Sequence, residues 1–505
     1  MALFQRSERG IGRGEIAESQ IEMPFFVAFM LCSVLGILVF HSMVENNSYT
    51  IALAISVIVF GTTILRVEFG LYILTIALLL SPEISAGNVG AQQERGVNLR
   101  YDDILIVIIT LGVFVKQAFE GRLTLWRPNP INPGILAYLS ICITSSLIAL
   151  YNNVSAWDGL VAIFVILKMF QFYMIFSLVG LVVTNVKMLQ HQLVVFFVVS
   201  AIVCIYGLFS IGTTYRVSTP FEAGGSEPNT LGGYLLIVIT IASGLFAYAP
   251  KRGQRLLFAC IMIIAFIPLL YTLSRATYVA LFFSVSMVAF LSRRQIMIGA
   301  IVLVLFLAPV IMPKEVLYRF EYTFHDEGVP IQVGGRETSI KVDKSTYERV
   351  YVWEKVLWNL RVWPWFGGGV SWDTVLDSQY ARVLIETGLL GFMAFMFLKY
   401  RMLKTAWESY RWNTYWVTKG LSLGMLATTL GLMVHCLGTI SFLIVRIMGP
   451  FWFLMGLTIV SRQMALLAHE QRLKAYYETQ QAEKEARIAE ELEGNPAPQP
   501  LQLHS

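Results

Sequence analysis

Residues 160–183 read LVAIFVILKMFQFYMIFSLVGLVV, an apolar run in which Lys168 is the one charged side chain. A helix that crosses the hydrocarbon core of a bilayer needs about 20 mostly apolar residues. The run meets that requirement, so it predicts a membrane-spanning helix.

The same length rule, applied along the whole chain, finds about fourteen such runs. They lie near residues 24–40, 50–65, 67–82, 103–119, 133–150, 160–183, 192–212, 230–249, 256–273, 276–292, 296–312, 379–399, 420–437 and 443–461. The third run is short and the last two are closely spaced, so twelve or thirteen spans is an open alternative. We predict an all-α fold, a polytopic membrane helix bundle of about 12–14 transmembrane helices.

The composition agrees with a membrane protein. The 505-residue chain is 56% apolar and 14% charged, with a mean hydropathy of +0.64, whereas soluble domains are about 25% charged. The net charge of +5 is modest and does not indicate a nucleic-acid partner. The five cysteines all lie in apolar runs and their number is odd, which argues against a disulfide framework or a metal site.

The positions of the basic residues predict the orientation. No small-residue cleavage signature follows the first apolar run, so we expect a retained helix rather than a signal peptide. Alternating the spans from a cytoplasmic N-terminus satisfies the positive-inside rule and leaves the C-terminus cytoplasmic as well. The short-loop residues placed inside are Arg66, Lys116, Arg122, Arg127, Lys187, Lys251, Arg252, Arg255, Arg293, Arg294, Lys399, Arg401, Lys404, Arg411 and Lys419. The arginines left outside, which need another reason, are Arg95, Arg100, Arg216, Arg275 and Arg446.

These spans divide the chain into five segments. We predict a cytoplasmic N-terminus (1–23), a bundle of about eleven helices (24–312), an extracytoplasmic loop domain (313–377), further transmembrane helices (378–461) and a cytoplasmic tail that is helical and then disordered (462–505). The loop domain is too long for a simple connection, which favours a functional role.

One helix is expected within this loop domain. Ser345-Thr346-Tyr347-Glu348 has the spacing of a capping box, which predicts a helix with Ser345 at its N-cap. Trp363-Pro364 should end it. Apolar residues recur along it at helical spacing and form a face that lies either on the membrane surface or on the helix bundle. This face consists of Val350, Trp353, Leu357 and Leu360.

Four short motifs follow one another along the chain. The first is Tyr215-Arg216 followed by Glu227-Pro228-Asn229-Thr230-Leu231-Gly232, and the second is Leu273-Ser274-Arg275-Ala276. The third is Trp363-Pro364-Trp365-Phe366-Gly367-Gly368-Gly369, and the fourth is Asp377-Ser378, then nine residues, then Gly388-Leu389-Leu390-Gly391. In this order, over roughly residues 100–460, they resemble the O-antigen ligase and Wzy-type polysaccharide polymerase superfamily. The chain departs from that pattern at Asp377, where the ligases carry a histidine.

The resemblance implies a GT-C-like membrane glycosyltransferase that uses an oligosaccharide on a polyprenyl diphosphate as its donor. It places Arg216 and Arg275 at the diphosphate leaving group, which a planar guanidinium can bind through two hydrogen bonds. It places Asp377 as the general base for the acceptor hydroxyl. The further residues expected to bind substrate are Arg349, Arg100, Arg446, Tyr215, Trp353, Asn229 and Ser378.

Two of these residues also have a structural interpretation. Asp377 could be the N-cap of the helix that begins at residue 378 or 379. Arg349 could form a salt bridge with Glu348 or Asp343.

Other polar residues in or near the spans admit more than one role. His325 in the outer loop is a rival base, although its context resembles a solvated turn. His435 lies inside an apolar span and is more typical of a hydrogen-bonded interior histidine than of a catalyst. Lys168 could pair with a carboxylate such as Asp158 or with a carbonyl group in the bundle.

These observations lead to a functional hypothesis. The chain is expected to be an inverting, metal-independent glycosyltransferase of the bacterial inner membrane that polymerises polyprenyl-diphosphate-linked repeat units of an exopolysaccharide or O-antigen. A ligase that hands the glycan to another acceptor, and a flippase for lipid-linked oligosaccharides, are the alternatives. No cofactor is expected, and the partners are the lipid-linked oligosaccharide, the bilayer and other polysaccharide assembly and export proteins.

Overall fold

The computed structural model describes residues 48–81, 83–84, 99–121, 124, 127–154, 157–220, 227–299, 329–333, 336–342, 344–372 and 377–493. The predicted span near 24–40, the N-terminal segment 1–23, Arg95, Asp343 and His325 lie outside these residues, as does almost all of the span near 296–312.

The described chain is helical apart from two short antiparallel strand pairs, β1 with β2 and β3 with β4. The elements in order are α2 (Ser48–Leu65), α3 (Val67–Leu80), β1 (Glu83–Ile84), β2 (Leu99–Arg100), α4 (Tyr101–Phe119), α5 (Asn132–Tyr151), α6 (Gly159–Val182), α7 (Val186–Ser210), α8 (Pro228–Tyr248), α9 (Arg252–Tyr271), α10 (Arg275–Ser292), β3 (Val329–Val333), β4 (Arg336–Val342), α13 (Lys344–Val362), α14 (Gln379–Trp412), α15 (Trp416–His435) and α16 (Val445–Glu493).

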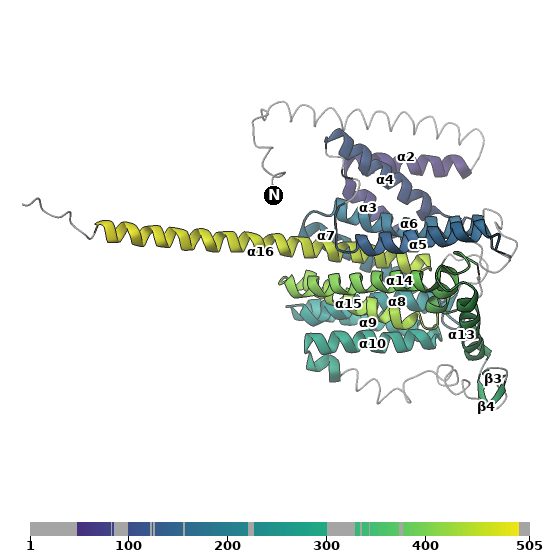
Figure 1. Ribbon diagram of the computed structural model, residues 1–505. Helices are drawn as coiled ribbons and strands as arrows, with labels where there is room; N and C mark the ends of the chain where they lie inside the picture. The colour runs from purple at the N-terminus through teal and green to yellow at the C-terminus, as the bar shows by residue number, and fades with distance from the viewer. Residues whose placement is uncertain are drawn as a thin grey trace, which may run out of the picture.

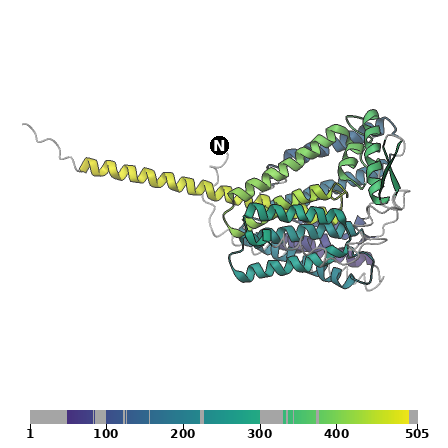
Figure 2. The same ribbon diagram turned by 90° about the horizontal axis from the view of Figure 1, so that it is seen from below.

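Within the described residues, nine helices are long and apolar enough to cross a membrane, namely α5 to α10 and α14 to α16. They lie side by side as a bundle, so the predicted polytopic helical architecture is confirmed (Figure 1). The predicted third span is α3, which has 14 residues and is shorter than a typical crossing. The long α13 and the β3–β4 hairpin lie together at one end of the bundle, which we call the α13 end (Figures 1 and 2).

Helix α8 forms the centre of the bundle. Of the 18 most apolar consecutive residues of α8, 94% are buried inside the protein, whereas only 22% are buried in the equivalent stretch of α9. It packs most closely on α15, where a Cβ added to Gly244 would lie 2.3 Å from the carbonyl oxygen of Gly420. Small residues let membrane helices approach at backbone distance, and this contact uses them on both helices.

The α14 helix extends beyond the span predicted near 379–399 and is broken within it. Gly388 has φ 64° and ψ −164°, which is not helical, so α14 consists of a short first segment and a long second segment. The break folds the first segment back, because the Tyr380 ring lies 6.2 Å from the ring of Phe395, fifteen residues later.

Two further expectations need correction, and the tail is as expected. Helix α13 begins at Lys344, so Ser345 lies within it and is not the N-cap, whereas its end at Val362 is as predicted. The tail is helical up to Glu493, as expected, and it continues the last span, because α16 runs without interruption from Val445 to Glu493 (Figure 1). Lys399 was placed with the cytoplasmic cations, but its side chain is buried, with the ammonium 3.1 Å from the ring centre of Phe442.

Candidate functional site

Arg216 and Arg275 belong to neighbouring turns at the α13 end. The Arg216 side chain donates from Nε to the carbonyl oxygen of Thr272 at 2.9 Å. Next to it, the backbone N–H of Val217 donates to the carbonyl of Tyr271 at 3.0 Å. Arg275 follows three residues after Thr272 and is the first residue of α10. The segment after α7 is therefore fixed to the turn between α9 and α10, and both arginines are half-buried there.

A chain of buried polar groups leads from this turn into the bundle. The Ser274 hydroxyl caps α10 and accepts a hydrogen bond from the Thr277 hydroxyl at 2.9 Å. The Thr277 oxygen lies 2.9 Å from Nε2 of His435, and Nδ1 of His435 lies 2.6 Å from the Ser441 hydroxyl. His435 is fully buried and is thus a hydrogen-bonded interior histidine.

The same polar chain ends beside Asp377. The Thr439 hydroxyl contacts His435 Nδ1 at 3.0 Å, and the backbone carbonyls of Thr439 and Cys436 both accept from the N–H of Gln379 at 3.1 Å. Ser378 occupies the N-cap position of α14, so the N-cap role considered for Asp377 is wrong. Asp377 is half-buried immediately before it. Contacts through His435 therefore connect the Ser274-Arg275 motif with the Asp377-Ser378 motif.

The Cys436 thiol lies between these motifs and is fully buried. Among the residues that the structure describes, no group of three or more His, Cys, Asp or Glu side chains is arranged to hold a metal ion.

The two glycine motifs meet each other at the break in α14. The carbonyls at the end of the short first segment lack helical partners, and the Gly367–Gly369 turn supplies them. Gly368 N–H donates to Ile385 and Gly369 N–H donates to Glu386, each at 2.9 Å. In the other direction, the N–H groups of Leu389 and Leu390 donate to the carbonyls of Pro364 and Trp365 at 2.9 and 3.2 Å.

Two side chains from other helices complete this backbone junction. Asn359 of α13 donates from Nδ2 to the Ile385 carbonyl at 2.9 Å. The Ser145 hydroxyl of α5 lies within hydrogen-bonding distance of the carbonyls of Phe366 (2.5 Å) and Glu386 (2.7 Å). The junction thus satisfies the backbone groups that the Gly388 break exposes, as buried peptide groups require.

A buried ion pair lies at the same junction. Arg382 Nε donates to Glu386 Oε1 at 2.7 Å, and that oxygen also accepts from the Ser371 N–H at 2.9 Å. The two side chains are 8% and 4% exposed. Sequence reasoning missed both residues, although charged side chains within a predicted span such as 379–399 are the signal that finds such sites.

We expect Glu386→Ala to destabilise the protein strongly. Removal of one partner from a buried ion pair leaves an uncompensated charge, which costs about 3–5 kcal/mol. Heat-induced loss of the monodisperse protein in detergent measures the effect. The matched control is Glu408→Ala, which breaks a more exposed pair with Arg462 and should shift the midpoint little. Equal shifts for the two variants would contradict this account.

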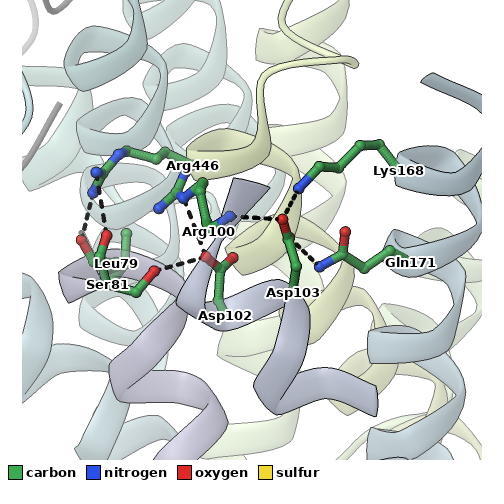
Figure 3. A network of polar contacts seen from close by, with 8 residues as sticks. All are labelled: Leu79, Ser81, Arg100, Asp102, Asp103, Lys168, Gln171 and Arg446. Carbon is green, nitrogen blue, oxygen red and sulfur yellow. Dashed lines mark hydrogen bonds and ion pairs between the residues drawn. The ribbon is translucent and has the colours of Figure 1, made fainter. Parts of the chain in front are cut away.

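A second polar network contains Arg100 and Arg446 (Figure 3). Arg446 is buried and donates from Nη1 to the carbonyl of Leu79 at 2.7 Å, at the C-terminal end of α3. Arg100 is buried beside Asp102, with Nε 3.1 Å from Oδ1, and the Ser81 hydroxyl donates to the same oxygen at 2.6 Å. Both arginines therefore have partners within the bundle, where their charges join α3, α4 and α16.

The neighbouring carboxylate accounts for Lys168. Asp103 forms an ion pair with Lys168 and accepts from Gln171 Nε2 at 2.6 Å (Figure 3). The pairing with Asp158 is wrong, because Asp158 caps α6 by accepting from the N–H groups of its first turn. Asp102 and Asp103 escaped the sequence analysis because both stand at the very start of the apolar run that forms α4.

The remaining candidates are distributed along the α13 end. Tyr215 is exposed beside Arg216, and Asn229 is half-buried in the first turn of α8. Arg349 and Trp353 both belong to α13, and the side chain of Arg349 lies outside the described residues. Trp353 is 42% exposed.

Comparison with known proteins does not assign this arrangement to a family. No protein-family model matches the chain, and no curated protein matches it.

Proposed function

We propose that this protein is a membrane glycosyltransferase that polymerises polyprenyl-diphosphate-linked oligosaccharide repeat units. The reaction would take place on the outer face of a bacterial cytoplasmic membrane, with both chain termini in the cytoplasm and a GT-C-like arrangement of helices. The α13 end would be the outer end, because Arg216 and Arg275, two of the arginines that the positive-inside rule leaves unexplained, lie there.

One observation carries this proposal. Three distant motifs are linked at one end of the bundle. Arg216 contacts Thr272. A polar chain then runs from Ser274 through Thr277 and His435 to the loop that holds Gln379. Glycosyl transfer from a diphosphate-linked sugar needs cations for the leaving group and a base for the acceptor. Two arginines and one carboxylate at this end can fill these roles.

The proposed reaction is a single inverting displacement. The acceptor hydroxyl oxygen bonds to the anomeric carbon of the donor while the bond from that carbon to the diphosphate oxygen breaks. Asp377 takes the hydroxyl proton as general base. Arg216 and Arg275 hold the polyprenyl diphosphate as it leaves with its electron pair, which is electrostatic stabilisation of the developing charge. No metal ion takes part in this scheme.

The remaining candidates would bind the sugars and the carrier. Tyr215 and Ser378 adjoin Arg216 and Asp377 in sequence, Asn229 lies in the first turn of α8, and Arg349 and Trp353 are carried by α13. Arg100 and Arg446 hold internal partners, so their contribution would be to fix the helices around the site.

Reconstitution with a defined donor tests the proposal. The purified protein in liposomes is given a polyprenyl-diphosphate-linked oligosaccharide, and products are resolved by length. A ladder of lengthened, carrier-linked chains is expected. Transfer only to an added non-carrier acceptor such as lipid A core would show a ligase instead. Movement of the donor between leaflets with no new glycosidic bond would show a flippase and overturn the enzymatic proposal.

A further inference from the structure

Helix α13 binds the bundle through one narrow face. Val352 and Val356 are buried against Ala381, Leu384 and Ile385 of the first segment of α14. Asn359, on the same face, is 2% exposed and makes the hydrogen bond to α14 described above. The helix lies crosswise to the long helices at the end of the bundle (Figures 1 and 2). Its position is thus set by packing against α14.

The rest of the α13 surface is not uniform. One flank carries Tyr351, Trp358 and Val362, spaced seven and four residues apart so that they align along the helix. They are 50%, 61% and 49% exposed, and Trp365, just beyond the helix, is 58% exposed. We call these four residues the α13 stripe. Glu354 and Arg361 are exposed on the ridge opposite the buried face, and the exposed Lys355 lies on the same flank as the stripe, where its long side chain can extend the ammonium toward lipid headgroups.

The α13 stripe continues an exposed apolar surface on a membrane-spanning helix. Trp365 is joined to α14 through its carbonyl, which accepts from the Leu390 N–H at 3.2 Å. From this point, exposed apolar side chains follow the second segment of α14 at helical spacing. They are Leu389, Met393, Phe397 and Tyr400, with 38%, 55%, 41% and 54% of their surface exposed.

This continuity identifies what covers the stripe. The exposed side chains of α14 belong to a span, where lipid is the surrounding solvent. At the end of the bundle, the exposed side chains next to this surface are the tryptophans and the tyrosine of the stripe. These two residue types are enriched at the level of the lipid headgroups. A helix with an apolar side and a charged ridge lies in the plane of that interface.

We propose that α13 is an interfacial helix whose stripe, Tyr351, Trp358, Val362 and Trp365, lies in the headgroup layer of the leaflet at the α13 end. The partner is the lipid surface itself. Trp353 and Leu357 lie on the other side of the buried face and are not part of the stripe. The inference does not depend on the proposed enzymatic activity.

Collision accessibility of spin labels tests this placement. The full-length protein, with Cys32 and the exposed Cys260 replaced by alanine, receives single cysteines at Trp358 or Val362 of the stripe. Glu354 and Arg361 on the charged ridge of the same helix provide matched controls. All four positions are exposed, so the variants should fold. Each is labelled with a nitroxide in phospholipid nanodiscs and relaxed with oxygen or with a water-soluble nickel chelate.

We expect labels at 358 and 362 to collide several-fold more often with oxygen, relative to the nickel chelate, than labels at 354 and 361. That ratio reports apolar surroundings for the stripe and water for the ridge. Higher nickel accessibility at 358 and 362 would place the stripe in water and overturn the inference. Low accessibility to both reagents would mean that protein covers the stripe, which would also overturn it.

Discussion

Arg275→Lys is expected to abolish polymer formation while the protein remains folded in the membrane. Lysine keeps the charge but loses the planar fork that binds a diphosphate through two hydrogen bonds. Removal of one preorganised donor from a site of developing charge lowers kcat by about 100- to 1,000-fold, and we expect an effect of this size. Initial rates on the defined lipid-linked donor measure it. Arg216→Lys and Asp377→Asn, tested in the same assay, should also abolish product.

Arg293→Lys is the matched control, because Arg293 is exposed at the opposite end of the same helix. It should retain the wild-type rate, and both variants should elute like the wild type in size-exclusion chromatography. A wild-type rate in Arg275→Lys would remove the diphosphate contact from the proposal. Loss of activity in both variants would mean that any change in helix α10 disturbs the enzyme, and the result would then not support a diphosphate contact by Arg275.

Gly388→Ala is expected to prevent correct folding. The φ of 64° with ψ −164° belongs to a region that is essentially restricted to glycine. A Cβ at this position would lie 2.5 Å from the carbonyl carbon and oxygen of Trp365, which are backbone atoms that cannot rotate away. The substitution therefore strains the chain and separates the two backbones whose hydrogen bonds form the junction. Recovery of monodisperse protein after membrane extraction measures the loss.

Gly180→Ala provides the comparison, because a Cβ there would meet no atom within 4 Å. That variant should be recovered like the wild type or better, since alanine favours helix over glycine. If Gly388→Ala were recovered as well as Gly180→Ala, the backbone contact with Trp365 could not be essential for the fold.

Hydropathy predicted the long helices because each must cover about 30 Å of lipid with apolar residues wherever it stands in the chain. It could not place the junction at Gly388. The pattern of Gly388 and Gly391 stood out in the sequence, but the partner of Gly388 is the backbone at Trp365, and no local rule relates a helix break to a turn more than twenty residues upstream. The same limit applies to Lys168, whose partner Asp103 lies on another helix.

The boundary expected at residue 462 marks a change of polarity within one continuous helix. Polarity does change there, from apolar to charged side chains. However, no glycine or proline occurs between Gly456 and Gly494, so nothing interrupts the backbone hydrogen bonds of the helix. A change of surrounding solvent is not a change of secondary structure.

The uninterrupted α16 connects the charged tail directly to the α13 end of the bundle. Its 49 residues span about 73 Å at 1.5 Å per residue, and Arg446 is the second of them. The charged tail and the residue that donates to the Leu79 carbonyl therefore belong to one helix. A displacement of the tail along the helix axis would also displace Arg446, and with it the contact at the C-terminal end of α3.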